Sequence, residues 1–390
     1  MKVLVTGGAV GDLPVIRELK RKGHFVITSG SDIRGIGHAE SDAYRPCDYT
    51  NVEGLVRLSI DERVDAIIPS AHDLAAIAAA RVAKLLNFPG YDSPEISEMI
   101  HNKNSLRFSL KECGIPQPNF KVISSECDLE QSRELQFPVI VKPVDLTGGN
   151  GISICEDFDS VRRAFLYARN LSKVQKVIIE EFIVGTYHGF TTMVSKGKVV
   201  WHLSDNEYFL YDKFRVSATT WPSTLYLNQT EQILNYLNSF VARFNLVEGL
   251  LHVQLVCTEN RVFILEICRR TPGDLYPDFV KLCGEESYLN QMINPFLGIT
   301  LNNVSKNLSR EVENAGVARF ILMPEVRGVF EKILFSHNLR PIQQEILLRP
   351  REFIDQPRKT SIGIFFFRKP ETFDLDDLIH IKERVRPVIS

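Results

Sequence analysis

Strand and helix signals alternate over the first hundred residues, and this alternation limits the possible folds more than any other feature of the chain. Val3–Val5, His24–Ile27 and Asp65–Pro69 are short apolar runs, while the alanine-rich stretch Asp73–Leu86 has the composition of a helix. Strands that alternate with helices favour a parallel, doubly wound sheet. We therefore predict an N-terminal α/β domain over residues 1–100.

The pattern changes after a turn-forming segment, Gly114–Pro118, where hairpins and helices replace the alternation. A chain of 390 residues is long for a single hydrophobic core, so two or three domains are expected. Towards its end the chain has short strands such as Gly328–Phe330 and Ile362–Phe367, and then an acidic-then-basic helix. We predict a central domain over residues 101–300 and a small β-rich C-terminal appendage over residues 301–390.

The bulk composition is that of an ordinary globular protein, with 44% hydrophobic residues, 24% charged residues and a formal net charge of −2. A charge so close to zero argues against a nucleic-acid backbone as the main partner. The seven cysteines are scattered, which favours reduced thiols over a disulfide framework or a zinc site. No uncharged apolar stretch reaches the ~20 residues that a membrane-spanning helix needs. We therefore expect a cytoplasmic protein that does not associate with membranes.

A lysine ends an apolar strand, and a glycine-rich loop follows it. The strand is Phe137–Pro143, with Lys142 near its end, and the loop Val144–Gly151 leads to a second apolar run, Ile152–Ile154. A buried lysine needs a partner for its charge, and glycines let backbone N–H groups approach an anion closely. The segment is typical of a cation and a flexible flap that grip a polyphosphate. The alternative is an ordinary hairpin whose lysine extends to solvent.

A second hairpin carries polar residues that suit a metal ion and phosphate groups. Its strands are Leu251–Cys257 and Val262–Ile267, and a three-residue connection, Glu259–Arg261, would place Gln254 opposite Glu266. One face would then carry His252, Gln254, Glu266, Cys268 and Arg270. A carboxylate, an amide oxygen and a guanidinium suit Mg²⁺ and phosphates. A two-residue connection would put Gln254 and Glu266 on opposite faces, and a solvated face with a surface salt bridge is the alternative to a site.

Two further segments allow both a binding role and a structural one. The strand Val177–Ile179 ends in two acids, followed by Phe182 and Ile183. The backbone of such a strand end can bond an adenine edge, or the acids can mark where the strand reaches solvent. Ser70–Asp73 opens the alanine-rich helix. Ser70 can cap this helix, which we favour, or the helix N-terminus can bind a substrate carboxylate.

The N-terminal glycines do not form a dinucleotide-binding motif. The spacing in Gly7–Gly11 does not fit Gly-x-Gly-x-x-Gly, and Thr28 and Ser29, rather than an acid, end the second strand. We interpret these glycines as turn-forming residues that line a substrate pocket, and disfavour a nicotinamide-dependent oxidoreductase.

Taken in order, these segments resemble the ATP-grasp superfamily, in particular the carboxylate–amine ligases related to biotin carboxylase and the L-amino acid ligases. The matching motifs are Asn102–Asn104, Cys113–Pro118, Phe137–Pro143 with the glycine loop, Ile179–Gly185, His252–Gln254 and Leu265–Asp274. The resemblance covers residues 1 to about 300. It implies an ATP-grasp fold of mixed α/β and α+β class, with a Rossmann-like domain before the ATP-grasp domain and a lid subdomain at about residues 115–190.

The resemblance also implies roles for individual residues. The ATP-binding residues would be Lys103, Lys142, Thr147, Gly148, Gly149, Gly151, Glu180, Glu181, Phe182, Ile183 and His188. Glu266 and Gln254 would hold Mg²⁺ or Mn²⁺, and Arg270 and Lys142 would act in catalysis. The substrate would contact Ser70, His72, Arg270 and Asp274.

The chain departs from the family pattern at three positions. Tyr187 replaces an acid that usually binds ribose, Gln254 stands where an acidic metal ligand is usual, and Cys268 stands where asparagine is usual. An amide oxygen can bind Mg²⁺ but supplies no charge, so a lower metal affinity or a changed metal arrangement is expected.

The activity that the resemblance implies is an ATP-dependent, ADP-forming ligase. It would activate a small-molecule carboxylate as an acyl phosphate and couple it to an amine, with an amino acid as one substrate. The resemblance also allows a homodimer. Two alternatives remain: a bicarbonate-activating carboxylase, which would need a biotinylated partner, and a catalytically weak, nucleotide-binding regulatory protein, which the three departures motivate.

Overall fold

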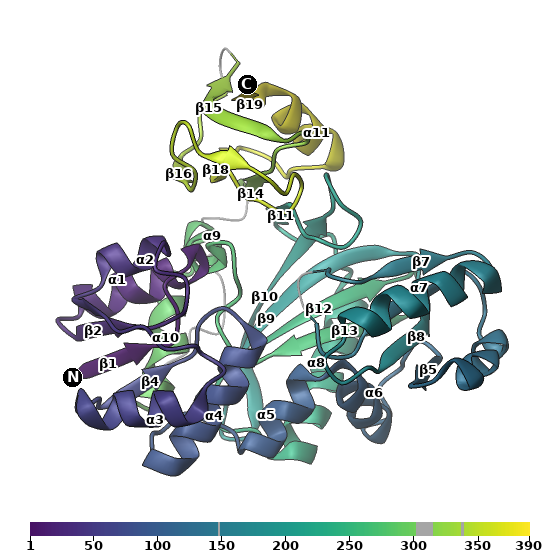
Figure 1. Cartoon of the computed structure of the whole chain (residues 1–390), viewed down its shortest axis with the longest axis horizontal. Coiled ribbons are helices and arrows are strands. Elements are labelled where there is room, and N and C mark those ends of the chain that lie inside the picture. The colour runs from purple at the N-terminus through teal and green to yellow at the C-terminus, as the bar shows by residue number, and fades with distance from the viewer. Residues whose placement is uncertain (147–148, 302–314, 337–338) are drawn as a thin grey trace.

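The computed structural model describes residues 1–146, 149–301, 315–336 and 339–390. Figure 1 shows the N-terminal part at the left, a broad sheet with its helices in the centre and at the right, and the C-terminal strands above them. The late helices α9 and α10 lie beside the N-terminal sheet (Figure 1). Their bounds are Tyr276–Leu282 and Tyr288–Ile293.

The N-terminal part is a four-stranded parallel sheet with the strand order β3-β2-β1-β4. Its strands are β1 Lys2–Val5, β2 Phe25–Thr28, β3 Ala43–Tyr44 and β4 Ala66–Ile68. The helices that follow them are α1 Leu13–Arg21, α2 Ile36–Glu40, α3 Val52–Asp61, α4 Asp73–Leu86 and α5 Pro94–His101. The central side chains of Leu4, Ile27 and Ile67 are fully buried between these layers. The predicted parallel, doubly wound sheet is confirmed, and α4 has the predicted bounds.

A small antiparallel sheet holds the predicted lysine strand. Its order is β5-β8-β6-β7. The strands are β5 Phe120–Ile123, β6 Val139–Pro143, β7 Ser153–Cys155 and β8 Val177–Glu181. Helix α7, Phe158–Leu171, packs Val161 and Phe165 against this sheet, and the 3-10 segment Glu126–Glu134 precedes β6. Helix α6, Lys103–Glu112, connects the small sheet to the N-terminal part.

The central sheet has eight antiparallel strands in the order β13-β12-β9-β10-β11-β14-β18-β16. The strands are β9 Thr186–Ser195, β10 Lys198–Tyr208, β11 Ala218–Trp221, β12 Gly249–Cys257, β13 Val262–Cys268, β14 Gly316–Leu322, β16 Gln343–Ile346 and β18 Gly363–Lys369. Helix α8, Leu227–Phe244, covers one face through Ile233, Leu237 and Phe240. The other face carries the polar residues described below.

The C-terminal region adds strands to this sheet and forms a second, smaller one. Strands β15 Gly328–Phe335, β17 Phe353–Ile354 and β19 Val385–Ile389 pair in the order β17-β15-β19. Helix α11, Leu375–Arg384, is the predicted acidic-then-basic helix. Because β14, β18 and β16 continue the central sheet, hydrogen bonding crosses the predicted boundary at residue 300; the domain boundaries themselves stay predictions.

Candidate active site

The hairpin β12–β13 has the predicted pairing, although its connection differs from the prediction. Gln254 lies opposite Glu266. The Thr258 N–H donates to the Arg261 carbonyl at 2.9 Å, so only two residues form the tip of the turn. The register then shifts between Gln254 and Leu255, where one extra residue on β13 forms a bulge. A two-residue tip alone would have put the two side chains on opposite faces, and the bulge restores them to one face.

Polar side chains continue across this face of the sheet. Gln254 pairs with Gly189 of β9, and Gly189 pairs with Asp205 of β10. Two residues further along β10, Glu207 pairs with Thr219 of β11, which pairs with Arg319 of β14. A Cβ on Gly189 would lie 2.7 Å from a carboxylate oxygen of Asp205. The glycine therefore leaves room for side chains from β10 and β12 to meet above β9.

A cavity of about 150 Å³ lies over this face. Its polar lining consists of Asp73, Glu207, His252, Gln254, Glu266, Arg270, Asp274 and Arg319. Asp73 comes from the N-terminal part and Arg319 from β14, so the cavity lies where three parts of the chain meet. All five residues predicted for one face of the hairpin, His252, Gln254, Glu266, Cys268 and Arg270, are thus brought together.

The two predicted phosphate-binding lysines each contact an acid. Lys103 Nζ lies 3.0 Å from Glu266 Oε1 and donates to the Leu146 carbonyl at 2.8 Å. Lys142 Nζ lies 2.6 Å from Glu180 Oε2. The ammonium groups are therefore fixed at the edge of the glycine loop and beneath the small sheet, where paired cations can bind a phosphate chain.

Glu180 is the buried anchor of Lys142. Its side chain, in a residue that is 1% exposed, also accepts hydrogen bonds from Arg107 Nε at 2.6 Å and Arg107 Nη2 at 3.3 Å. Arg107 donates further to the Ile264 carbonyl at 3.0 Å, which links α6 to β13. Burial raises the pKa of Glu180, but Arg107 and then Lys142 outweigh this effect and lower it to about 2. Glu180 is therefore ionised at neutral pH.

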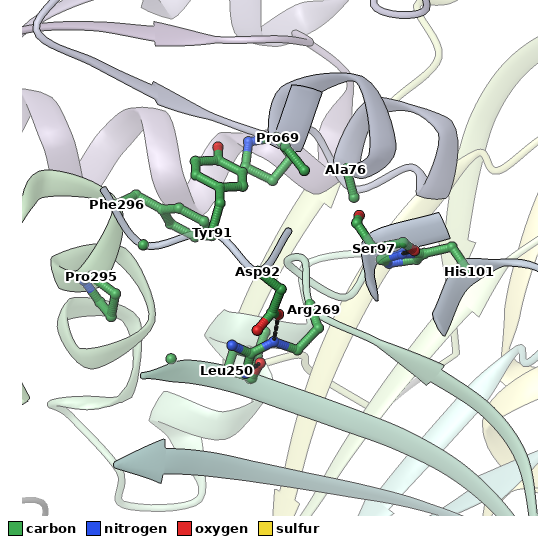
Figure 2. Close-up of a pocket in the computed structure, with 13 residues that line it drawn as sticks. Pro69, Ala76, Tyr91, Asp92, Ser97, His101, Leu250, Arg269, Pro295 and Phe296 are labelled. Carbon is green, nitrogen blue, oxygen red and sulfur yellow. Dashed lines mark hydrogen bonds and ion pairs between the residues drawn. The ribbon is translucent and has the colours of Figure 1, made fainter. Parts of the chain in front are cut away.

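Two consecutive arginines tie the end of β13 to the N-terminal part. Arg270 donates to Asp73, the first residue of α4, at 2.7 Å. Arg269 contacts a different acid: its Nε lies 2.8 Å from Asp92 Oδ2, in a small cavity (Figure 2). Arg269 also donates to the Leu250 carbonyl at 2.6 Å. The pair positions Arg270 beside the cavity and closes the junction behind it.

The acids of β10 lie in a low-dielectric environment. Burial raises the pKa of Asp205 to about 6, and the Tyr276 hydroxyl donates to this carboxyl at 2.6 Å. Burial, followed by the charge of Asp205, raises the pKa of Glu207 to about 8. Burial also lowers the pKa of His252 to about 3, with smaller effects from Arg270 and Arg319, so this imidazole is neutral. A cation placed near Glu207 would lower its pKa again.

The predicted adenine-binding residues lie around the end of β8. Glu180 is paired on both sides, with β5 and β6, and its side chain is held by Arg107 and Lys142. The Glu181 carboxylate accepts from the Gln136 N–H and the Asn119 amide. Phe182 and Ile183 follow the strand and are half-buried. Contact with adenine stays a prediction for these residues.

His188 lies on the opposite face of the central sheet from Gln254. It is 1% exposed, and its ring nitrogens contact the Asp205 carbonyl at 3.2 Å and the Thr186 hydroxyl at 2.8 Å. Burial lowers its pKa to about 4. This placement gives no support to its predicted contact with ATP, which stays a prediction.

Two of the four predicted loop residues can be placed. Gly149 and Gly151 both have φ of +76°, which favours glycine. A Cβ on Gly149 would lie 3.0 Å from Cβ of Phe214, in the connection between β10 and β11. The loop thus contacts the central sheet region at this point. Thr147 and Gly148 lie outside the described residues.

The predicted substrate residues divide into two groups. Arg270 and Asp274 line the cavity, and the Asp274 carbonyl accepts from Arg319 at 3.0 Å. The predicted cap by Ser70 is wrong, because α4 begins at Asp73 and His72 immediately precedes it; His72 Nδ1 accepts from the Leu74 N–H at 3.3 Å. Ser70 is buried, and its N–H donates to the Thr6 hydroxyl. Substrate contacts of these residues stay predictions.

The donor set fits a magnesium ion that is shared with a nucleotide. Glu266 offers a partly exposed carboxylate, and Gln254, opposite it, offers an amide. Mg²⁺ commonly takes one or two carboxylates and completes its shell with water and substrate phosphates. Among the described residues no group of three His, Cys, Asp or Glu side chains could hold a metal ion by itself.

Four residues of the site were not predicted from the sequence. Arg107 lies one helical turn after Lys103, a spacing that places both on one side of α6 and is a usable signal. Asp205 and Glu207 lie two residues apart near the end of β10, a spacing that puts both on one face of a strand and is also visible in the sequence. Arg319 gives no such signal, because its partners lie far away in the chain.

Comparison with known proteins shows which family the central part of the chain resembles. Residues 100–273 match the family model described as ATP-grasp domain. The predicted resemblance to the ATP-grasp superfamily and the predicted ATP-grasp fold are confirmed. No helix in the described parts of the chain is long and apolar enough to cross a membrane.

Individual relatives are distant. The chain is 28% identical over 194 residues to formate-dependent phosphoribosylglycinamide formyltransferase of Mannheimia succiniciproducens, which is 48% of either chain. It spans about half the length of the curated relatives it matches.

Two solved structures show how far the fold likeness extends. An L-amino acid ligase from Bacillus licheniformis has a TM-score of 0.74 at 19% identity and covers 100% of this chain and 99% of its own. The biotin carboxylase domain of 2-oxoglutarate carboxylase from Hydrogenobacter thermophilus, solved with MgADP and bicarbonate, has a TM-score of 0.78 at 16% identity, with coverages of 100% and 90%. The fold is therefore shared along the whole chain.

Proposed function

We propose that this protein is an ATP-dependent, ADP-forming ligase that joins a carboxylate to an amine, with an amino acid as one substrate. The observation that carries the proposal is the arrangement of three cations: Lys103 contacts Glu266, Arg270 lines the polar cavity with Glu266, and Lys142 is held by Glu180. Each cation is held by an acid, and together they would neutralise a triphosphate beside a substrate carboxylate. The likeness to an L-amino acid ligase supports the choice of substrate.

The chemistry explains why cations and a shielded cavity suffice. A carboxylate resists attack by an amine because it is anionic and its oxygen leaves poorly. Its oxygen attacks the γ-phosphorus of ATP, the bond to ADP breaks, and an acyl phosphate forms. The amine then attacks the carbonyl carbon and displaces phosphate. Lys103, Lys142 and Arg270 would neutralise the phosphate charge, and the cavity would exclude water from the intermediate.

Bound magnesium would supply further neutralisation of the phosphates, held by Glu266 and Gln254. The chain's own part is to orient these groups. Lys103 and Glu266 are 3.0 Å apart, so the ammonium and the metal-binding carboxylate face the same phosphates.

Phosphate release tests the proposal. The protein is incubated with ATP and Mg²⁺, with and without a pool of amino acids, and released phosphate is measured. We expect release that depends on an amino acid. Release that depends instead on bicarbonate would support a carboxylase. ADP binding without turnover in any mixture would support a regulatory nucleotide-binding protein and contradict the ligase.

A further inference from the structure

Gln254 and Glu207 form a contact that joins two strands of the sheet across a third. Gln254 Nε2 lies 3.1 Å from both Oε1 and Oε2 of Glu207. Their strands, β12 and β10, are separated by β9, whose residue beside Gln254 is Gly189. Glu207 lies two residues beyond Asp205, the β10 partner of Gly189, so the amide and the carboxylate meet diagonally across β9. The contact is therefore a built feature of this face.

The contact determines which end of the Gln254 amide is available. An amide has a donor end and an acceptor end, and only the oxygen can bind a cation. Because the Nε2 group donates to Glu207, the oxygen is directed away from Glu207. Glu266 is the cross-strand neighbour of Gln254 on the other side, on β13. The side-chain oxygen of Gln254 can therefore bind the same ligand as Glu266.

The surroundings indicate that the cavity holds a polar ligand. In the described parts of the chain, His252 Nδ1 and Arg319 Nε are buried and have no hydrogen-bond partner. The two residues are 7% and 5% exposed, and both line the cavity beside Glu207 and Gln254. Buried polar atoms usually have partners, so atoms without them inside a cavity point to a ligand that supplies them.

We propose that Glu207 and Gln254 act as one unit that replaces the usual carboxylate ligand of the metal. Gln254 supplies the oxygen ligand, and Glu207 fixes the amide in the required orientation by accepting from its Nε2 group. Glu207 is a positioning residue, because it acts through Gln254. Partners of this kind, which orient a metal ligand, typically contribute about 10–100-fold to metal affinity. The inference rests on the proposed function for Glu266 and Gln254 as the metal ligands and for ADP as the nucleotide.

Metal binding tests the unit directly. Mn²⁺ is titrated into the full chain, with and without ADP, and free Mn²⁺ is measured by electron paramagnetic resonance. Glu207→Gln should weaken Mn²⁺ binding by about 10-fold or more. Gln254→Glu alone places two acids side by side without a donor between them. The double variant Glu207→Gln with Gln254→Glu exchanges the amide and the carboxylate, restores the hydrogen bond, and should bind Mn²⁺ within about 3-fold of the wild type.

The controls separate metal binding from folding. Glu285→Gln, which changes another buried glutamate away from the cavity, should leave Mn²⁺ affinity unchanged. Thermal unfolding of each variant confirms that it is folded. Wild-type affinity in Glu207→Gln, or an exchanged variant that binds no better than Glu207→Gln, would overturn the inference, as would a wild type that binds no Mn²⁺. A wild type that binds Mn²⁺ but not ADP contradicts the proposed function, while the same variants still decide the inference.

Discussion

Glu180 shows how a single buried residue can position two cations. It lies between Arg107 and Lys142, with contacts of 2.6 Å to each. A buried carboxylate with two cationic partners holds both of them in place, and the removal of one partner leaves charge uncompensated. The two predictions at this scale concern the two cations.

Replacing Lys142 by alanine should reduce ATP use by at least about 100-fold, because one phosphate-binding cation is lost from a shielded site. Turnover and ADP affinity measure the effect. Lys121→Ala is the matched control, since Lys121 belongs to the same small sheet but pairs with Glu134 at the surface. Normal turnover in Lys142→Ala would refute its role.

Replacing Arg107 by leucine should destabilise the protein by about 3–5 kcal/mol near neutral pH. The ordinary pKa of 4.5 for Glu180 is lowered to about 2 in the folded protein, chiefly by Arg107 once the opposing effect of burial is overcome. A lowered pKa contributes stability above pH ~4.5 that is lost as the pH falls towards 2. The difference in the free energy of unfolding between the wild type and Arg107→Leu should therefore shrink as the pH falls over this range.

Urea unfolding at several pH values measures that difference. Arg243→Leu, which removes an exposed ion pair with Glu112, should cost less than about 1 kcal/mol. A difference for Arg107→Leu that is the same at pH 3 and pH 7 would contradict the account of Glu180.

At the scale of elements, the hairpin β12–β13 shows what sequence patterns can and cannot establish. The opposition of Gln254 and Glu266 was predicted correctly, but from a three-residue connection that is wrong. Alternation reports which residues share a face only while the register is unbroken, and the bulge on β13 breaks it. Local periodicity does not reveal such a bulge.

The remaining site residues also divide into those that a local sequence motif predicts and those that it does not. Lys103, Lys142, Glu266 and Arg270 were found from local motifs. Arg107 meets Glu180 across 73 positions, and Gln254 meets Glu207 across 47. Contacts at this separation depend on strand order, which one sequence does not show. The joining of β14, β18 and β16 to the central sheet was missed for the same reason, as was β19.

Gly189→Ala tests whether the neighbouring side chains need the space that this glycine leaves above β9. The added Cβ would lie 2.7–2.8 Å from the carboxylate oxygens of Asp205, a fully buried residue that also accepts from Tyr276. We expect a loss of about 1–3 kcal/mol in urea unfolding, because overpacking forces side chains from their positions. Gly273→Ala is the control, since its Cβ would meet nothing within 4 Å. An equal and small effect of both substitutions would contradict this packing.

For the whole molecule, the active site depends on the junction between the N-terminal part and the central sheet. Arg270 reaches Asp73, and Arg269 reaches Asp92 (Figure 2). The side chains of Arg269 and Asp92 are 9% and 6% exposed, so the pair is buried. The junction therefore holds Arg270 at the cavity and also contributes to stability.

Asp92→Asn should lower stability by about 3–5 kcal/mol, because it leaves the buried guanidinium of Arg269 without its carboxylate. The midpoint of urea unfolding measures the loss. Glu98→Gln removes an ion pair with Arg81 that is about half exposed, and should cost less than about 1 kcal/mol. A midpoint for Asp92→Asn no lower than that of Glu98→Gln would show that the junction does not depend on this pair.

The central claim is that the carboxylate is activated as an acyl phosphate, and the path of its oxygen atoms tests this most directly. The protein is incubated with ATP, Mg²⁺ and an amino acid pool whose carboxylates carry oxygen-18, and the released phosphate is analysed by mass spectrometry. Displacement of phosphate by the amine breaks the bond between carbon and oxygen, so the account predicts one labelled oxygen in each phosphate. Amino-acid-dependent release of unlabelled phosphate, or of AMP and pyrophosphate, would contradict it.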